Sequence, residues 1–313
     1  MKLIAVTPEK KYDYTTSQIV EGLISLGHHI TATSSGNGID YSCQDDDFIK
    51  ESKSADAALF FFGKVRDNNP PRHYLVDKIK TPFEKRAYID GSEWTFTGHQ
   101  TQNQINMSMI DEACRRGEPW INNDMKEKCK FYFKRETYKI DQEKGIIPLP
   151  FGMSKNHILK EKNKDIDVFC VFGHVKTGLR QKVVDYCNSL SKNSNFNVVV
   201  SSDIPKNEYQ DLLSRSRIVI DCWGGGDTCD RFYEAIGAKS CCLYQKYNVI
   251  VPNQFVDWQH AVSFKDMNEF DFSMQKLLSS KKITQEIGKQ GFHHALQWHT
   301  VEQRAHTILE KLK

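Results

Sequence analysis

Short apolar segments alternate with amphipathic segments along the chain. Leu3–Val6, Ile30–Thr33 and Ala57–Phe62 are apolar runs of strand length. Between the first two, Thr15–Leu26 carries its apolar residues at helical spacing and ends before a glycine. Strands that alternate with helices are typical of βαβ units, so the pattern predicts a parallel sheet covered by helices. Further elements expected in this half are strands at 86–89 and 120–121 and a helix at 100–117.

The same alternation begins again at residue 166. Strands are expected at 166–172, 196–200, 218–222, 241–244 and 261–264, and helices at 177–191, 205–215, 228–238 and much of 283–312. Between the two series, Gly145–Gly152 contains two prolines and two glycines, which argues against the interior of a sheet. We therefore expect two α/β domains, 1–152 and 166–313, joined by a linker at 153–165. The final helix is placed so that it can pack back on the N-terminal domain.

The composition fits an ordinary globular protein, with 39% hydrophobic and 27% charged residues among 313. No apolar run approaches the ~20 residues of a membrane helix, and the first residues do not resemble a signal peptide. The nine cysteines include no C-x-x-C pair, which is typical of free thiols in a reducing compartment. We expect a soluble, cytoplasmic protein, in the host cytoplasm if its origin is a phage.

The net charge of +3 is small for a protein that coats nucleic acid. A basic groove created by the fold remains compatible with this total. No metal site is expected, because paired ligand spacings are absent. Asp45-Asp46-Asp47 contains a D-x-D pattern, but the three residues stand in a polar segment expected to be a solvated loop.

A first candidate site directly follows the strand expected at 166–172. Its sequence is Gly173-His174-Val175-Lys176-Thr177-Gly178-Leu179-Arg180. Glycines let a backbone approach a ligand, and the free N–H groups at a helix start favour an anion. Lys176 and Arg180 add positive charge where the helix dipole disfavours it, and a bound polyanion would offset that cost. The segment predicts a diphosphate site; the alternative is an ordinary strand-to-helix turn with solvated basic side chains.

A second candidate site lies after the strand expected at 218–222, where Gly224–Gly226 leads into the next helix. Thr228 is expected to cap that helix. Arg231 and Glu234 are three residues apart and therefore share one helix face. A guanidinium can bind phosphate through two hydrogen bonds, and a carboxylate can accept bonds from two ribose hydroxyls. The pair suits a nucleotide; the alternative is an ion pair on a helix surface.

The two motifs together resemble those of GT-B glycosyltransferases, in which two Rossmann-like domains with parallel sheets face each other across a cleft. G-x-x-[KR]-[ST]-G-x-R after the first strand of the second domain, and R-x-[WY]-E on a later helix, are similar to the motifs of phage DNA β-glucosyltransferases and related group-1-type enzymes. The resemblance implies transfer of a hexose or pentose from a nucleotide-diphosphate sugar, most often a UDP-sugar, to an acceptor hydroxyl. The residues implied in donor binding are Gly173, His174, Lys176, Thr177, Arg180, Gly225, Arg231 and Glu234.

One departure from the family pattern concerns stereochemistry. Many retaining GT-B enzymes carry two glutamates eight residues apart on this helix, but the positions eight before and eight after Glu234 are Gly226 and Cys242. The sequence therefore favours an inverting reaction, which requires a general base in the N-terminal domain. Asp90 is expected to be that base, because it follows a strand and so should point into the cleft, as an Asp does in phage β-glucosyltransferases. Glu93 is the rival, and the alternative for Asp90 is a plain turn.

The acceptor expected from the resemblance is a hydroxymethylated base in double-stranded phage DNA, with a glycan or a lipid-linked saccharide as the alternative. The donor is a substrate, so no tightly bound cofactor is expected, and a divalent metal requirement is left open. A different class, a non-catalytic two-domain protein that closes on a small ligand, also fits two α/β units. A nicotinamide-dependent dehydrogenase is disfavoured, since neither half carries G-x-G-x-x-G after its first strand.

Overall fold

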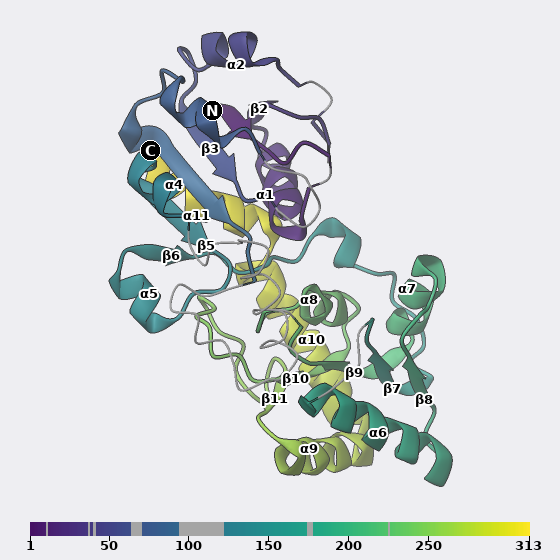
Figure 1. The fold of residues 1–313 in the computed structure, drawn as a ribbon. Coiled ribbons are helices and arrows are strands. Elements are labelled where there is room, and N and C mark those ends of the chain that lie inside the picture. Colours follow the sequence, from purple (N-terminus) through teal and green to yellow (C-terminus); the bar gives the residue numbers. More distant parts are fainter. Residues whose placement is uncertain are drawn as a thin grey trace.

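The computed structural model describes residues 1–10, 12–36, 38–39, 42–63, 71–93, 122–173, 178–224 and 226–313. Each half of the chain forms a sheet of parallel strands with helices packed around it (Figure 1). The strand order is β2-β1-β3-β4-β5-β6 in the first sheet and β11-β10-β9-β7-β8 in the second. The predicted α/β class with two parallel sheets is therefore confirmed. The helix expected at 100–117 and the strand expected at 120–121 lie outside the described residues.

The expected strands and helices that fall on described residues are present in the expected order, and the structure adds elements at 45–51, 123–128, 131–134, 139–143, 146–148 and 267–279 that the pattern did not predict. The N-terminal elements are β1 (Lys2–Val6), α1 (Tyr14–Ser25), β2 (His29–Ala32), α2 (Asp45–Glu51), β3 (Ala57–Phe61), η2 (His73–Asp77), η3 (Phe83–Lys85), β4 (Arg86–Asp90), α4 (Asn123–Lys128), β5 (Phe131–Lys134), α5 (Lys139–Glu143), β6 (Ile146–Pro148) and η4 (Lys155–His157). The C-terminal elements are β7 (Ile166–Val171), α6 (Gly178–Asn193), β8 (Val198–Ser201), α7 (Lys206–Ser214), β9 (Ser216–Asp221), α8 (Asp230–Gly237), β10 (Cys241–Gln245), β11 (Val262–Phe264), α9 (Met267–Ser279), α10 (Lys281–Trp298) and α11 (Val301–Leu312).

Both faces of each sheet are buried, because successive side chains of a strand point to opposite faces. In β1, Leu3 and Ala5 belong to one hydrophobic cluster, whereas Ile4 and Val6 belong to another on the opposite side. In the same way, the residues of β7 alternate between two further clusters. Strands buried on both sides read as continuous apolar runs, which is why the sequence shows them so clearly.

Two segments differ from the sequence-based expectation. Gly145–Gly152 was expected to stay out of the sheets, but Ile146–Pro148 forms the edge strand β6 and pairs with β5. The expectation was wrong because a proline at the end of an edge strand need not donate to a neighbouring strand. Asp45, Asp46 and Asp47, expected in a loop, form the first turn of α2.

The C-terminal helix α11 returns to the N-terminal half and packs against α1 (Figure 1). Its side chains Ala305, Ile308, Leu309 and Leu312 lie in the same hydrophobic cluster as the strands of the first sheet. The chain therefore crosses between the halves twice, and hydrogen bonds connect the two crossing segments. The Nε of buried Arg304 donates to the carbonyl oxygens of Pro150 and Phe151 at 3.0 and 3.1 Å.

Eight cysteines in the described part of the chain are free thiols, and all of them except Cys229 are buried. This agrees with the expectation of unpaired cysteines; Cys114 lies outside that part. Among the residues the structure describes, no helix has both the length and the apolar character needed to span a membrane.

Candidate functional site

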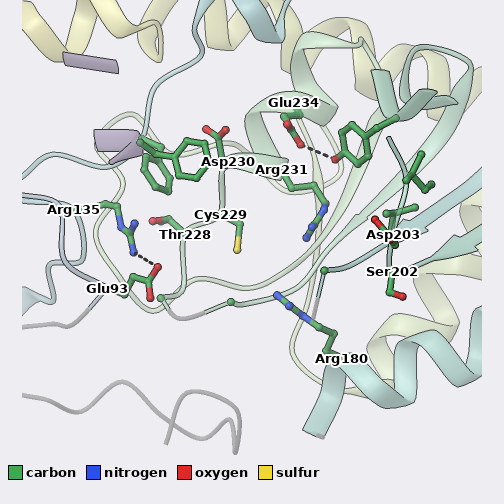
Figure 2. A pocket seen from close by; sticks show the side chains of 18 residues that line it. Glu93, Arg135, Arg180, Ser202, Asp203, Thr228, Cys229, Asp230, Arg231 and Glu234 are labelled. Atoms are coloured by element: carbon green, nitrogen blue, oxygen red, sulfur yellow. Dashed lines mark hydrogen bonds and ion pairs between the residues drawn. The ribbon is translucent and has the colours of Figure 1, made fainter. Parts of the chain in front are cut away.

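A cavity of about 460 Å³ lies between the two halves, at the carboxyl ends of β7, β8 and β9. Figure 2 shows side chains from both halves around it. Open parallel sheets bind ligands at this end of their strands, so the position agrees with a substrate site. The N-terminal half contributes Tyr14, Glu93, Arg135 and Phe151 to the lining. The C-terminal half contributes Val171, Gly173, Arg180, Ser202, Asp203, Ile204, Tyr209, Gly224, Gly226, Thr228, Cys229, Asp230, Arg231 and Glu234.

The structure brings together the two arginines that the motifs singled out. Arg180 belongs to the first turn of α6 and Arg231 to the first turn of α8, and both guanidinium groups lie over the ring of Phe172, at 4.8 and 4.7 Å from its centroid. Figure 2 shows both side chains directed toward the same part of the cavity. Two segments about 50 residues apart in sequence thus place two permanent positive charges beside one pocket.

Each arginine is fixed by the end of strand β9. The Nη2 of Arg180 donates to the carbonyl oxygens of Cys222, at 2.7 Å, and Trp223. The Nη1 of Arg231 lies 3.5 Å from Oδ1 of Asp221, which is fully buried. Burial raises the pKa of Asp221 to about 6, although both arginines favour its charged form. The guanidinium groups are therefore held in place before any ligand binds.

Glu234 also lines the cavity, on the same helix as Arg231. The hydroxyl of Tyr209 donates to Oε2 of Glu234 at 2.7 Å, and the ring of Tyr209 packs edge-on against Phe169. Burial, reinforced by the negative charge of Glu234, raises the pKa of Tyr209, so the hydroxyl remains a donor. The hydrogen bond holds one oxygen of Glu234 and leaves lone pairs on the carboxylate for a ligand.

The glycine-rich loop lies between β9 and α8, as predicted, but the N-cap of α8 differs from the predicted one. Cys229, and not Thr228, is the N-cap of α8. Thr228 instead donates its hydroxyl to Glu136 of the N-terminal half. At Gly226, a Cβ atom would lie 2.7 Å from Oε1 of Glu136, so the loop has no room for a side chain there. This explains physically why position 226, eight residues before Glu234, carries no carboxylate.

Asp90 does not point into the cavity, so that expectation was wrong. The residue is only 2% exposed, and the Nζ of Lys134 lies 2.9 Å from its Oδ2. Tyr132 and the backbone N–H of Ser92 also donate to the carboxylate. Burial alone would raise the pKa of Asp90, but these partners outweigh it and hold the pKa below its usual value. The residue after a strand was expected to face the cleft, but a lysine on the adjacent strand turns the carboxylate inward.

Glu93, the rival of Asp90, lines the cavity from the N-terminal half. Its Oε1 lies 4.0 Å from Nη2 of Arg135, as the dashed line in Figure 2 marks. The guanidinium of Arg135 in turn lies 4.6 Å from the ring centroid of Phe151. Of the two candidate bases, Glu93 is therefore the one that the fold brings to the cavity.

Of the remaining predicted donor-binding residues, Gly173 lines the cavity, and a Cβ atom there would meet no atom within 4 Å. His174, Lys176, Thr177 and Gly225 lie outside the described residues. The described residues contain no cluster of three or more His, Cys, Asp or Glu side chains that could hold a metal ion.

Several lining residues were missed by the sequence analysis. Tyr14 stands at the start of α1, Arg135 follows β5, and Tyr209 lies within α7. None of them belongs to a glycine-rich segment, and only the tertiary structure brings them to the motifs. Arg135 alone had a usable signal, since it lies in a short run of aromatic and charged residues in the half that should supply acceptor contacts.

Comparisons with known proteins agree with this geometry. Residues 157–310 match the family described as glycosyl transferase-like. The comparison with curated proteins gives no significant match. Among solved structures, an alpha-glucosyltransferase in complex with UDP-glucose and DNA containing an abasic site is 10% identical, with a TM-score of 0.58 over 99% of this chain and 98% of its own. Another structure of an alpha-glucosyltransferase, in complex with UDP, is 9% identical, with a TM-score of 0.59 over 99% of both chains.

A third similar structure comes from Anabaena. HepE in complex with UDP-glucose is 9% identical, with a TM-score of 0.61 over 100% of this chain and 99% of its own. The fold is therefore GT-B over the full length, as expected from the two motifs. The family match covers the C-terminal part of the chain, which holds both motifs.

Proposed function

Because the chain has the GT-B fold and a glycosyl transferase-like C-terminal half, we propose that it transfers a sugar from a UDP-sugar to an acceptor hydroxyl. The observation that carries the proposal is the meeting of Arg180, Arg231 and Glu234 at one cavity between the halves. A similar alpha-glucosyltransferase and Anabaena HepE have UDP or UDP-glucose bound, which supports UDP as the nucleotide.

In the proposed complex, Arg180 and Arg231 bind the diphosphate and Glu234 accepts hydrogen bonds from the ribose hydroxyls. Lys176, His174 and Thr177 extend the diphosphate contacts, and Gly173 and Gly225 let the backbone approach the ligand. As the bond between sugar and diphosphate breaks, negative charge grows on the leaving phosphate. Guanidinium groups that are already fixed stabilise this charge without reorganising.

Glu93 is the proposed base that takes the proton of the acceptor hydroxyl. It lies on the N-terminal side of the cavity, opposite the arginines of the C-terminal half. A base on the opposite side of the sugar from the leaving group produces inversion at the anomeric carbon. Retention is the second candidate, because the two similar DNA-bound or UDP-bound enzymes are alpha-glucosyltransferases and a UDP-glucose donor is itself alpha-linked.

For the acceptor we propose a hydroxymethylated base in DNA, with a glycan or a lipid-linked saccharide as the alternative. The DNA in the complex of a similar alpha-glucosyltransferase supports the first. The net charge of +3 is compatible with either. A protein that closes on the nucleotide without chemistry would share the same cavity, so only turnover separates it from the enzyme.

The test is a panel of UDP-sugars assayed for UDP release with hydroxymethylated DNA, unmodified DNA and simple glycans. We expect release that depends on both the donor and a hydroxyl-bearing acceptor, with the transferred sugar found on that acceptor by mass spectrometry. NMR of the product then gives the anomeric configuration. If the protein binds UDP but releases none from any UDP-sugar with any acceptor, it is a binding protein without transferase activity. If it does not bind UDP, the proposed donor is refuted.

A further inference from the structure

Glu136 of the N-terminal half reaches across to the glycine-rich loop of the C-terminal half. It follows β5 by two residues and has 0% of its surface exposed. A buried carboxylate is costly unless hydrogen-bond donors surround it. The donors it uses come mainly from the other half of the molecule, more than 90 residues further along the chain.

Three donors of the loop converge on this carboxylate. The backbone N–H of Asp227 donates to Oε2 at 3.1 Å, and the backbone N–H of Thr228 donates to Oε1 at 3.3 Å. The hydroxyl of Thr228 donates to Oε1 as well. The Nε of Arg135 lies 3.2 Å from Oε1 and supplies the opposite charge. Burial raises the pKa of Glu136, while Arg135 and the loop donors oppose that rise by stabilising the anion.

The glycine-rich loop packs closely against the carboxylate of Glu136. A Cβ atom at Gly226 would lie 2.7 Å from Oε1 and 2.8 Å from Cδ of Glu136. On the far side of the loop, the buried carboxylate of Asp227 accepts from the backbone N–H of Asn248 at 2.7 Å. The segment is therefore held from both sides just before α8 begins.

This segment determines where the binding groups of α8 stand. Gly226 and Thr228 line the cavity, and Arg231 and Glu234 follow within two turns of helix. The N-terminal half holds the first residue of the helix too, since Nε2 of Gln18 donates to Oδ1 of Asp230 at 2.8 Å. The donor-binding helix is thus anchored to the opposite half of the molecule at its start.

We propose that Glu136 is a positioning residue for the nucleotide sugar: it does not line the cavity, but its carboxylate holds the glycine-rich loop and thereby the start of α8 in the binding position. The inference rests on the proposed function for its ligand and goes beyond it by making donor affinity depend on contact between the halves. The ionised carboxylate offers acceptors to all three loop donors at once. A glutamine at position 136 would place an N–H₂ donor opposite one of these loop donors, where the carboxylate offers an acceptor.

The test compares Glu136→Gln with the wild type and with Glu302→Gln as the matched control. Glu302 also accepts a hydrogen bond from a residue distant in sequence, since Ser25 donates to its Oε1 at 2.7 Å, but it does not line the cavity. Hydrogen exchange of the unliganded proteins should be about tenfold faster at the amides of Asp227 and Thr228 in Glu136→Gln only. The calorimetric Kd for UDP should rise about tenfold in that variant, which is the scale of one charged hydrogen bond, and stay unchanged in the control.

The partner residue supplies a second, independent variant. Thr228→Val removes the hydroxyl donor and should reproduce the weaker UDP binding, whereas Thr228→Ser keeps the donor and should restore it. The double variant Glu136→Gln/Thr228→Val should bind UDP little worse than either single variant, because both remove one interaction. Weaker UDP binding that came from a general loss of folding would not be restored by keeping the hydroxyl donor in Thr228→Ser.

The outcomes separate this inference from the proposed function. Wild-type exchange rates and wild-type UDP affinity in Glu136→Gln would overturn the positioning role while leaving the sugar-transfer proposal intact. A wild-type protein that binds no UDP would overturn the proposed function and the donor-positioning role with it. The exchange measurement needs no ligand and would still decide whether Glu136 anchors the loop.

Discussion

Two carboxylates three residues apart, Asp90 and Glu93, have opposite surroundings. Asp90 is enclosed by Lys134 and Tyr132, whereas Glu93 stands at the wall of the cavity beside Arg135. The same side-chain chemistry therefore serves the packing of the sheet in one case and lines the cavity in the other. The difference lies in the neighbours that the sheet supplies and not in the local sequence.

Substitutions at these two carboxylates should separate stability from turnover. Asp90→Asn leaves the buried ammonium of Lys134 without its counter-charge and should lower the free energy of unfolding by about 3–5 kcal/mol. Glu93→Gln should leave unfolding unchanged and lower turnover at least ~100-fold, the low end for loss of a general base. Urea denaturation and a UDP-release assay measure the two effects. Normal turnover in Glu93→Gln would remove it from the mechanism.

Arg231 lines the cavity from a fixed position beside Asp221, and we propose that its charge binds the diphosphate. Arg231→Ala should weaken UDP binding by about 1.5–3 kcal/mol, the scale of hydrogen bonds to charged groups. Calorimetry gives the affinity, and the matched control is Arg215→Ala, an arginine of the same half whose ion pairs with Asp165 and Asp211 lie on the surface. Equal affinity in wild type and Arg231→Ala would contradict the assignment of this residue to the diphosphate.

At the scale of elements, the contact between α1 and α11 depends on a glycine. Gly22 lies on α1 where the start of α11 comes closest, and a Cβ atom there would stand 2.2 Å from the carbonyl oxygen of Val301. The two backbones can approach this closely only because no side chain intervenes. The close packing lets the apolar face of α11 reach the first hydrophobic cluster.

Gly22→Ala should therefore lower the free energy of unfolding by about 1–3 kcal/mol, because the added methyl group forces the helices apart. Ser17→Ala, on the same helix, is the control and should have little effect, since the side chain is only partly buried. Denaturant unfolding monitored by circular dichroism measures both. A Gly22→Ala variant as stable as the wild type would show that α11 can move without cost.

At the scale of the whole molecule, the C-terminal end of the chain completes the N-terminal core. Ile308, Leu309 and Leu312 are buried among side chains of the first sheet, and Arg304 joins the two crossings. The N-terminal half loses part of its core if the C-terminal half unfolds and withdraws α11. The GT-B fold places its cleft between two units, but here a shared helix couples their stabilities.

Heating should therefore unfold the protein in a single cooperative transition despite its two sheets. Scanning calorimetry should give equal calorimetric and van't Hoff enthalpies, which is the signature of two-state unfolding. Saturating UDP should raise the temperature of that one transition, since a ligand of the native state stabilises all of it. Two separate transitions, of which UDP shifts only one, would show that the halves unfold independently.

Much of the fold could be predicted because buried parallel strands are apolar along their full length. The runs at Leu3–Val6 and Ala57–Phe62 correspond to strands in the structure almost residue for residue. The strand at 146–148 was missed because its proline is tolerated only at a sheet edge, and a sequence does not say which strand is the edge. The N-cap was misplaced because Thr228 uses its hydroxyl on Glu136, a partner more than 90 residues away.

The sequence by itself determined the α/β class, the two series of strands and the two motifs with Arg180, Arg231 and Glu234, because these depend on local periodicity and on glycine spacing. Only the tertiary structure decided that Asp90 is enclosed, that Glu93 reaches the cavity and that Glu136 holds the glycine-rich loop. The physical reason is that the role of a carboxylate depends on which donors and charges surround it. Those neighbours come from strands and loops distant in sequence, and the chain brings them together only when it folds.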